Sequence, residues 1–132
     1  MHPADPSLPP LLVVDGANVV GSVPDGWWRD RRGAAERLRD RLAATGGPSD
    51  GPHPGPYEIV LVVEGAARGV ASVPGVRVEE APGSGDDLIA ELARQAKGRP
   101  CLVVTADREL RRRVEAEGAR CAGPRSVLRP PT

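Results

Sequence analysis

Three short, uninterrupted runs of aliphatic residues constrain the fold of this chain more than any other feature. They cover residues 11–14, 59–63 and 101–104, and each is followed closely by a polar residue. An apolar run without polar alternation is typical of a strand that is buried on both faces of a parallel sheet. Residues 76–78 and 119–122 are predicted to form two weaker strands, the first of them nearer a sheet edge.

The segments between these runs have the spacing of amphipathic helices. We predict helices over residues 29–44, 86–97 and 107–117, each with apolar side chains on one side and charged side chains on the other. Strands that alternate with helices favour a parallel sheet with right-handed crossovers. The predicted fold class is therefore α/β, a three-layer α/β/α sandwich around a five-stranded parallel sheet.

Composition limits the core and the number of domains. The 132 residues suffice for one domain, predicted over residues 11–129 after a flexible, proline-rich segment at 1–10. With no Phe, two Trp and one Tyr, the core must be aliphatic. Glycine and proline gather in residues 46–56, which we predict to be a mobile loop. Trp28 is expected to pack inward onto the first long helix and Trp27 to remain partly exposed.

The composition and the lengths of the apolar runs also exclude several classes of protein. Two cysteines are too few for a secreted disulfide scaffold, and both are expected to be small core residues. The longest apolar run is far shorter than the roughly 20 residues of a transmembrane helix, and residues 1–10 lack the pattern of a signal peptide. We therefore expect a cytoplasmic protein with no membrane partner. A formal net charge of zero argues against broad coating of nucleic acid, although not against a local site.

Acidic residues cluster where the predicted strands end. Asp15 follows the first strand, Glu64 the second, and Asp107 lies just beyond the fourth. Asp86 and Asp87 open the helix that precedes the fourth strand, at the same edge of the sheet. Because ligands of parallel α/β sheets bind beyond the carboxyl ends of the strands, we expect these five carboxylates to converge. Taken singly, each acid is also an ordinary turn or helix-capping residue.

A cluster of five carboxylates would be self-repelling, and no lysine lies beside it in the sequence to neutralise it. Oxygen ligands without Cys or His favour a hard divalent cation, Mg²⁺ or Mn²⁺. Such an ion, held by a few acids, suits hydrolysis at phosphorus. Arg68 and Arg108 each lie just beyond one of the acids and are candidate phosphate contacts. The basic run at residues 111–113 is interpreted as a solvated helix face.

Four motifs occur in an order that is similar to a known group of proteins. They are Leu12–Asn18 (LVVDGAN), Val62–Gly65 (VVEG), Ser84–Ile89 (SGDDLI) and Val103–Leu110 (VVTADREL). This order resembles the PIN-like superfamily, and the closest branch is the NYN ribonucleases. The resemblance spans residues 11–123. It implies a Rossmann-like, five-stranded sheet with metal-dependent endonuclease activity, usually on RNA. Many PIN-like proteins form homodimers, so the resemblance also allows a homodimer here.

The resemblance further implies a role for individual residues. Asp15 would be the central metal ligand, Asn18 would hold a carboxylate, a water or a phosphate, and the Thr105 hydroxyl would support the ligands. Water activated by the metal would attack the phosphodiester and leave a 3′-hydroxyl and a 5′-phosphate. Glu64 stands where NYN proteins more often carry Asp. The expected catalytic residues are Asp15, Asn18, Asp86 and Asp107, and the expected metal ligands are Asp15, Glu64, Asp86, Asp87 and Asp107.

Two alternatives to a metal-dependent ribonuclease stay open. Small size and neutral charge also suit a nucleotide phosphohydrolase that acts on a small nucleotide. A PIN-like module that binds RNA or a protein without cleaving is the other alternative. The sequence also leaves open which of Asp86 and Asp87 contacts the metal.

Overall fold

The computed structural model describes residues 8–128 of the chain and contains one five-stranded parallel sheet. The strand order is β3-β2-β1-β4-β5, which confirms the predicted α/β fold and places the weak third strand at an edge. The strands are β1 (Leu11–Asp15), β2 (Glu58–Val63), β3 (Val76–Glu80), β4 (Cys101–Val104) and β5 (Arg120–Ala122).

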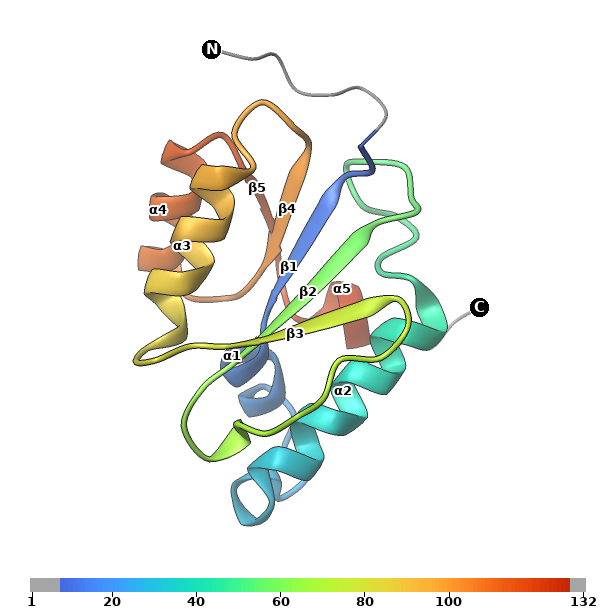
Figure 1. The fold of residues 1–132 in the computed structure, drawn as a ribbon, viewed down its shortest axis with the longest axis vertical. Helices are drawn as coiled ribbons and strands as arrows, with labels where there is room; N and C mark the ends of the chain where they lie inside the picture. Colours follow the sequence, from blue (N-terminus) through green and yellow to red (C-terminus); the bar gives the residue numbers. More distant parts are fainter. Residues whose placement is uncertain (1–7, 129–132) are drawn as a thin grey trace.

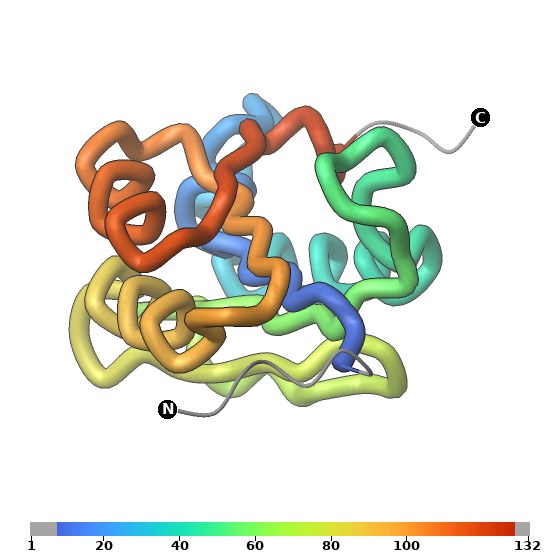
Figure 2. Tube along the Cα trace, turned by 90° about the horizontal axis from the view of Figure 1, so that it is seen from above, coloured from blue at the N-terminus to red at the C-terminus, as the bar shows by residue number. Residues whose placement is uncertain are grey.

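Helices cover both faces of this sheet, as predicted for a three-layer sandwich. The helices are α1 (Gly16–Gly21), α2 (Arg31–Thr45), α3 (Gly85–Gln95), α4 (Arg108–Ala116) and α5 (Arg125–Leu128), with 3₁₀ turns at η1 (Trp27–Arg29) and η2 (Gly65–Ala67). Side chains of α1, α2 and α5 pack in one core cluster, and those of α3 and α4 pack in a second cluster on the opposite face. Figure 1 shows α3 and α4 on one side of the strands and α2 on the other, and Figure 2 shows the same layers from above.

The core is aliphatic, as the lack of phenylalanine requires. Leu12, Leu61 and Leu102 are fully buried in the cluster beneath α2. Tyr57 is the one aromatic side chain among the buried residues of the described chain. Burial raises the pKa of the Cys101 thiol to about 11, which keeps this residue protonated as a small core side chain.

The glycine- and proline-rich loop at residues 46–56 contains no helix or strand, as predicted. Pro48 is buried, and the Tyr57 hydroxyl donates a hydrogen bond to the His53 carbonyl oxygen at 2.8 Å. Most of the predicted flexible segment at 1–10, and residue 129, lie outside the described residues. No helix among residues 8–128 combines the length and apolar character needed to cross a membrane.

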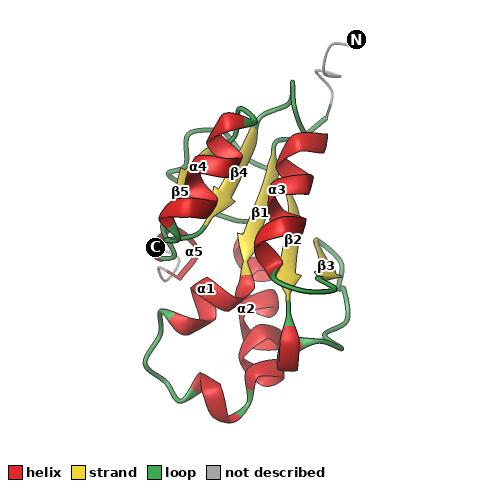
Figure 3. Ribbon diagram, turned by 90° about the vertical axis from the view of Figure 1, so that its left-hand side faces the viewer, coloured by secondary structure: helices red, strands yellow, loops and turns green. Residues whose placement is uncertain are grey.

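Helix α1 is the element that sequence patterning missed. Apart from Ala17, its six residues (GANVVG) are glycine, asparagine and valine, which have low helix propensity. The helix forms because the Asp15 side chain caps it and because Gly16 lies directly against the β2 backbone. From β1 the sheet grows outward to β2 and β3, and then returns to β4 on the other side of β1. Figure 3 shows the strands pointing toward the end of the molecule where α1 lies.

Candidate functional site

The site is organised around Asp15, the last residue of β1. Its side chain is only 6% exposed. One carboxylate oxygen accepts a hydrogen bond from the Thr105 hydroxyl at 2.9 Å, and the other accepts from the Asn18 backbone N–H at 3.4 Å. Asp15 therefore sits between β1 and β4, where the strand order reverses and where ligands of such sheets bind.

Thr105 and Asn18 connect Asp15 to the loop that follows β4. The Thr105 hydroxyl, which is fully buried, also accepts a hydrogen bond from the Asp107 backbone N–H at 3.1 Å. The Asn18 side-chain oxygen accepts from the Ala106 backbone N–H at 2.8 Å. These contacts hold α1 and the start of α4 at a fixed separation, so the predicted supporting role of Thr105 has a direct structural basis.

Asp107 begins α4 and caps it. One carboxylate oxygen accepts hydrogen bonds from the backbone N–H groups of Glu109 at 2.9 Å and Leu110 at 3.1 Å. Arg111, one turn along the same helix, donates from its Nε atom to the Thr105 carbonyl oxygen at 2.8 Å. Helix capping therefore orients the Asp107 side chain, and Arg111 fixes the loop from which it projects.

Glu64 and Asp86 bring the third and fourth carboxylates to the same place. Glu64 follows β2, and its carboxylate accepts a hydrogen bond from the Gly85 backbone N–H at the start of α3. Gly85 is buried, and a side chain there would begin 3.4 Å from the Glu64 carboxylate oxygen. Asp86 is the next residue and is half-buried. The contact between Glu64 and Gly85 thus fixes the position of Asp86.

The pKa values of Asp15 and Asp86 are raised by their surroundings, including the charges of neighbouring acids. Burial raises the pKa of Asp15, and the charges of Asp86 and Glu64 raise it further, while the hydrogen bond from Thr105 opposes the shift. Burial also raises the pKa of Asp86, and Asp107 and Glu64 add to the effect. The neighbouring carboxylates therefore disfavour the ionised forms of Asp15 and Asp86. We call Asp15, Glu64, Asp86 and Asp107 the acidic cluster.

Asp87, the fifth predicted acid, points elsewhere. Its side chain is 83% exposed and forms an ion pair with Arg113 of α4, with 3.1 Å between the Oδ1 and Nη2 atoms. The structure thus separates the two neighbours that the sequence could not distinguish: Asp86 faces the acidic cluster, and Asp87 ties α3 to α4.

The predicted phosphate contacts differ from one another in their surroundings. Arg68 donates to the carbonyl oxygens of Ala81 and Pro82, both at 2.9 Å, so its guanidinium already holds the segment after β3. Arg108 is exposed at the first turn of α4. The interpretation of residues 111–113 as a solvated face is wrong for Arg111, which is half-buried and donates to the Thr105 carbonyl oxygen. Arg113 is exposed and forms a surface ion pair with Asp87, which agrees with a solvated face.

The donor chemistry of the acidic cluster fits a hard cation, since it offers only carboxylate oxygens. The present side-chain positions do not form a finished site: among residues 8–128, no three His, Cys, Asp or Glu side chains are arranged to hold a metal ion. Asp15, Glu64 and Asp107 instead use carboxylate oxygens to bind backbone N–H or hydroxyl groups. Rotation of these side chains would be needed for them to bind one ion together.

The prediction for Trp28 is wrong, because its side chain points outward and the residue is 56% exposed. Trp27 is half-buried and so partly exposed, as predicted. Their rings meet edge to face at 6.0 Å between centroids. The pair lies in the 3₁₀ turn η1 rather than in α2, so helical spacing did not apply to it. Trp27 lines a cavity of about 240 Å³ that also includes Glu64 of the acidic cluster.

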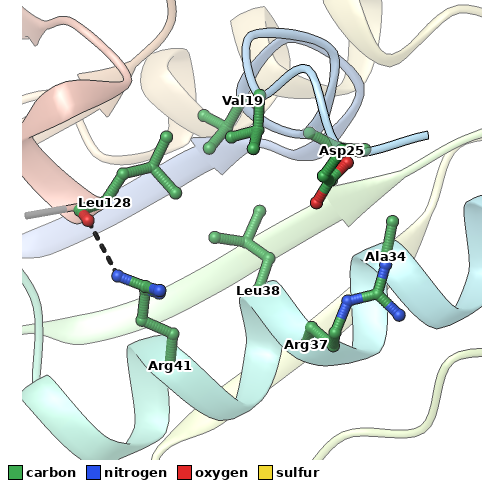
Figure 4. Close-up of a pocket in the computed structure, with 9 residues that line it drawn as sticks. Val19, Asp25, Ala34, Arg37, Leu38, Arg41 and Leu128 are labelled. Atoms are coloured by element: carbon green, nitrogen blue, oxygen red, sulfur yellow. Dashed lines mark hydrogen bonds between the residues drawn. The ribbon is translucent and has the colours of Figure 1, made fainter. Parts of the chain in front are cut away.

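A second cavity, of about 230 Å³, lies between α1, α2 and α5 and contains none of the predicted site residues. Val19 and Leu38 form part of its apolar lining, and Asp25 and Arg37 also border it (Figure 4). The Arg41 guanidinium donates to the Leu128 carbonyl oxygen at 2.7 Å, which fastens the end of α5 across the cavity. This contact stabilises the fold on the face away from α3 and α4.

Comparison with solved structures identifies proteins of the same fold. A crystal structure of Rae1 (YacP) from Bacillus subtilis matches with a TM-score of 0.67 and 21% sequence identity, over 89% of this chain and 71% of that chain. A tryptophan-to-leucine mutant of Rae1 matches with a TM-score of 0.67 and 18% identity, over 90% of this chain and 72% of that chain. No protein-family model and no curated protein sequence matches. The chain therefore shares the α/β fold of the Rae1 structures.

Proposed function

We propose that this protein is a metal-dependent ribonuclease that hydrolyses phosphodiester bonds at the acidic cluster. The observation that carries the proposal is that four acids, at the ends of β1 and β2 and at the starts of α3 and α4, lie at the carboxyl edge of the sheet, where the strand order reverses. The choice of RNA rests on the resemblance of the motifs to NYN ribonucleases. The likeness to the Rae1 structures supports the fold on which such a site is built.

The cofactor we propose is Mg²⁺ or Mn²⁺, held by Asp15, Asp86 and Asp107 with Glu64 at the border. When bound, the ion supplies positive charge against the scissile phosphate and activates water for attack on phosphorus. Ionised Asp15 and Asp86 are disfavoured in the metal-free protein, as their raised pKa values indicate. A bound cation would offset this repulsion, which is the physical link between the cluster and a metal.

The residues around the cluster position it for this reaction. Thr105 and the Asn18 backbone N–H bind both oxygens of Asp15 and fix the direction of its remaining lone pairs. The Asn18 side chain holds the loop that carries Asp107. Asp86 has no hydrogen bond to its carboxylate within residues 8–128, so it is free to turn toward a cation. We assign catalytic roles to the acids and positioning roles to Asn18 and Thr105.

The test is cleavage of end-labelled, single-stranded RNA by the purified protein with Mg²⁺ or Mn²⁺. Asp15→Asn and Asp107→Asn are expected to lower the rate by at least about 100-fold, the lower end of what one charged or proton-transferring group contributes. Asparagine also caps helices, so Asp107→Asn retains the start of α4.

Glu115→Gln is the matched control, because Glu115 is an exposed acid on α4 outside the cluster. Its activity should equal that of the wild type. Equal activity of all four proteins would contradict the proposal. Hydrolysis of a nucleoside triphosphate with RNA left intact would instead favour the nucleotide phosphohydrolase.

A further inference from the structure

The cavity beside the acidic cluster has features that the chemistry of phosphodiester hydrolysis does not require. It lies between α1, the start of α2 and the end of β2, with a volume of about 240 Å³. Val20, Ala35 and Val63 make much of its wall apolar, while Trp27 adds an aromatic ring and Arg31 a cation. A mostly apolar pocket with a few polar groups is the usual form of a small-ligand site.

The cavity shares one residue, Glu64, with the acidic cluster. Glu64 lines it and also raises the pKa values of Asp15 and Asp86. Gly16, the residue after Asp15, forms another part of the wall. A ligand in this cavity would therefore contact Glu64 and the backbone beside Asp15.

The volume of the cavity and the side chains that line it indicate which kind of ligand it can hold. The volume is below the roughly 300–1,000 Å³ of sites for drug-sized ligands, so the cavity suits one flat ring system rather than a whole dinucleotide. Single-stranded RNA is commonly recognised by bases that splay out and stack on aromatic rings. The Arg31 guanidinium lies over one face of the Trp27 ring, 5.3 Å from its centroid, and forms no ion pair within residues 8–128. A cation so placed can meet the phosphate attached to a base that contacts Trp27.

We propose that this cavity is the subsite for one nucleobase of single-stranded RNA, adjacent to the phosphate that the acidic cluster cleaves. The inference rests on the ribonuclease function proposed above and extends it to substrate recognition. The part of the Trp27 ring that Arg31 does not cover provides the stacking surface, and Arg31 binds the phosphate of the same nucleotide. Shape and stacking select for a base without reading its identity, because every base has a flat aromatic face.

Trp28 offers a matched control in the same turn. It is more exposed than Trp27, touches it edge to face, and does not line the cavity. The chain has two tryptophans, so Trp28→Phe leaves Trp27 as the single fluorescent indole and Trp27→Phe leaves Trp28. The two variants report separately on the cavity and on the neighbouring surface.

The experiment measures binding in an Asp15→Asn background, in which cleavage is removed, with Mg²⁺ present. A single-stranded RNA hexamer is added to Asp15→Asn/Trp28→Phe and to Asp15→Asn/Trp27→Phe, and indole fluorescence is followed. Quenching is expected in the first protein and not in the second. Quenching that is equal in both, or absent from the first while RNA binds, would overturn the subsite. The protein in which quenching is expected keeps Trp27, so the expected signal does not depend on the folding of a variant truncated at that residue.

The affinity of the tryptophan variants for the RNA hexamer gives the second readout. Trp27→Ala should weaken RNA binding by about 5- to 150-fold, as expected for loss of one stacked base, and Trp28→Ala by less than about twofold. Removing one base from the hexamer should weaken its binding to the Asp15→Asn single variant. The same change should not weaken binding to Asp15→Asn/Trp27→Ala, which lacks the stacking ring. An abasic hexamer that binds as well as the intact one would contradict the proposal. So would a nucleoside monophosphate that binds as tightly as the hexamer, or a hexamer that does not bind.

The outcomes separate this inference from the proposed function. If the wild type cleaves RNA and Trp27→Ala does not change the KM for RNA, the subsite is removed and the ribonuclease remains. Base-dependent binding at Trp27 without cleavage by the wild type would leave the subsite and remove the ribonuclease.

Discussion

At the scale of single residues, the state of Asp15 is the central fact. Asp15 is almost completely removed from water, yet within residues 8–128 its carboxylate receives one hydrogen bond from a side chain and one long contact from the backbone. Burying a charge costs free energy unless partners compensate. The raised pKa of Asp15 shows that compensation within the protein is incomplete. The protein thus keeps an acid whose ionised form is stabilised poorly by the fold itself.

This state predicts how the stability of the metal-free protein depends on pH. Asp15 has a higher pKa in the folded protein than in the unfolded chain. Its protonated form therefore stabilises the folded protein, and this contribution is fully present at a pH below the unfolded pKa. It is lost as pH rises through the folded pKa. Asp15→Asn cannot ionise, so the melting temperature of the variant relative to the wild type should rise as pH increases from about 4 to 8. Thermal unfolding in EDTA measures this difference.

Asp40→Asn is the control, since Asp40 is an exposed acid of α2. Its melting temperature relative to the wild type should stay nearly constant over the same range. If Asp15→Asn behaved like Asp40→Asn, the raised pKa of Asp15 would be wrong.

At the scale of elements, α1 decides how close the cluster lies to the sheet. A Cβ atom at Gly16 would be 2.5 Å from the Val62 backbone oxygen, a distance that real contacts do not reach. At Gly21, the other end of the helix, the nearest atom would be 3.8 Å away, on the Trp27 ring. Glycine at the first position therefore allows α1 to approach β2, while the glycine at the last position is not needed for packing.

These two glycines form a matched pair for a stability measurement. Gly16→Ala should lower the free energy of unfolding by about 1–3 kcal/mol, because α1 must shift away from β2. Gly21→Ala should change it by less than about 0.5 kcal/mol. Urea denaturation of both variants checks the difference. Equal effects of the two substitutions would mean that α1 does not pack as described.

The central strands, and the acids that follow them, are the elements that the sequence predicted correctly. The aliphatic runs predicted the three central strands because a strand buried on both faces must be apolar throughout. Acids after those strands came together because the carboxyl ends of parallel strands share one edge. Asp86 and Asp87 could not be separated, since both occupy the first turn of α3 and only the position of α4 with Arg113 distinguishes them.

Other features depended on contacts that no periodicity encodes. Helix α1 is too short and too poor in helix-forming residues to give a signal, and it depends on Asp15 and on the close approach at Gly16. Arg111 looked like one of three solvated cations, but it contacts the Thr105 carbonyl. The orientation of Trp27 follows from the 3₁₀ turn before α2, and helical spacing placed the wrong indole inward.

At the scale of the whole molecule, the net charge of zero is an average over distinct regions. The acidic cluster gathers at one edge of the sheet, while Arg29 and Arg31 flank the tryptophans at the start of α2. Several other arginines are already paired, among them Arg99 with Glu58 at 2.8 Å. The charge balance therefore fits a protein that meets RNA locally, at a cation-filled site with a neighbouring basic and aromatic surface, rather than over a broad basic face.

The most direct test of the central claim is a Mn²⁺ titration followed by the electron paramagnetic resonance signal of the free ion. The wild type is expected to bind Mn²⁺ saturably, and Glu115→Gln to bind it equally well. Asp15→Asn and Asp107→Asn should each weaken binding by at least about tenfold, or about 1.4 kcal/mol, because each removes one charged oxygen ligand. The same affinity in all four proteins, or no saturable binding by the wild type, would contradict a cation site at the acidic cluster.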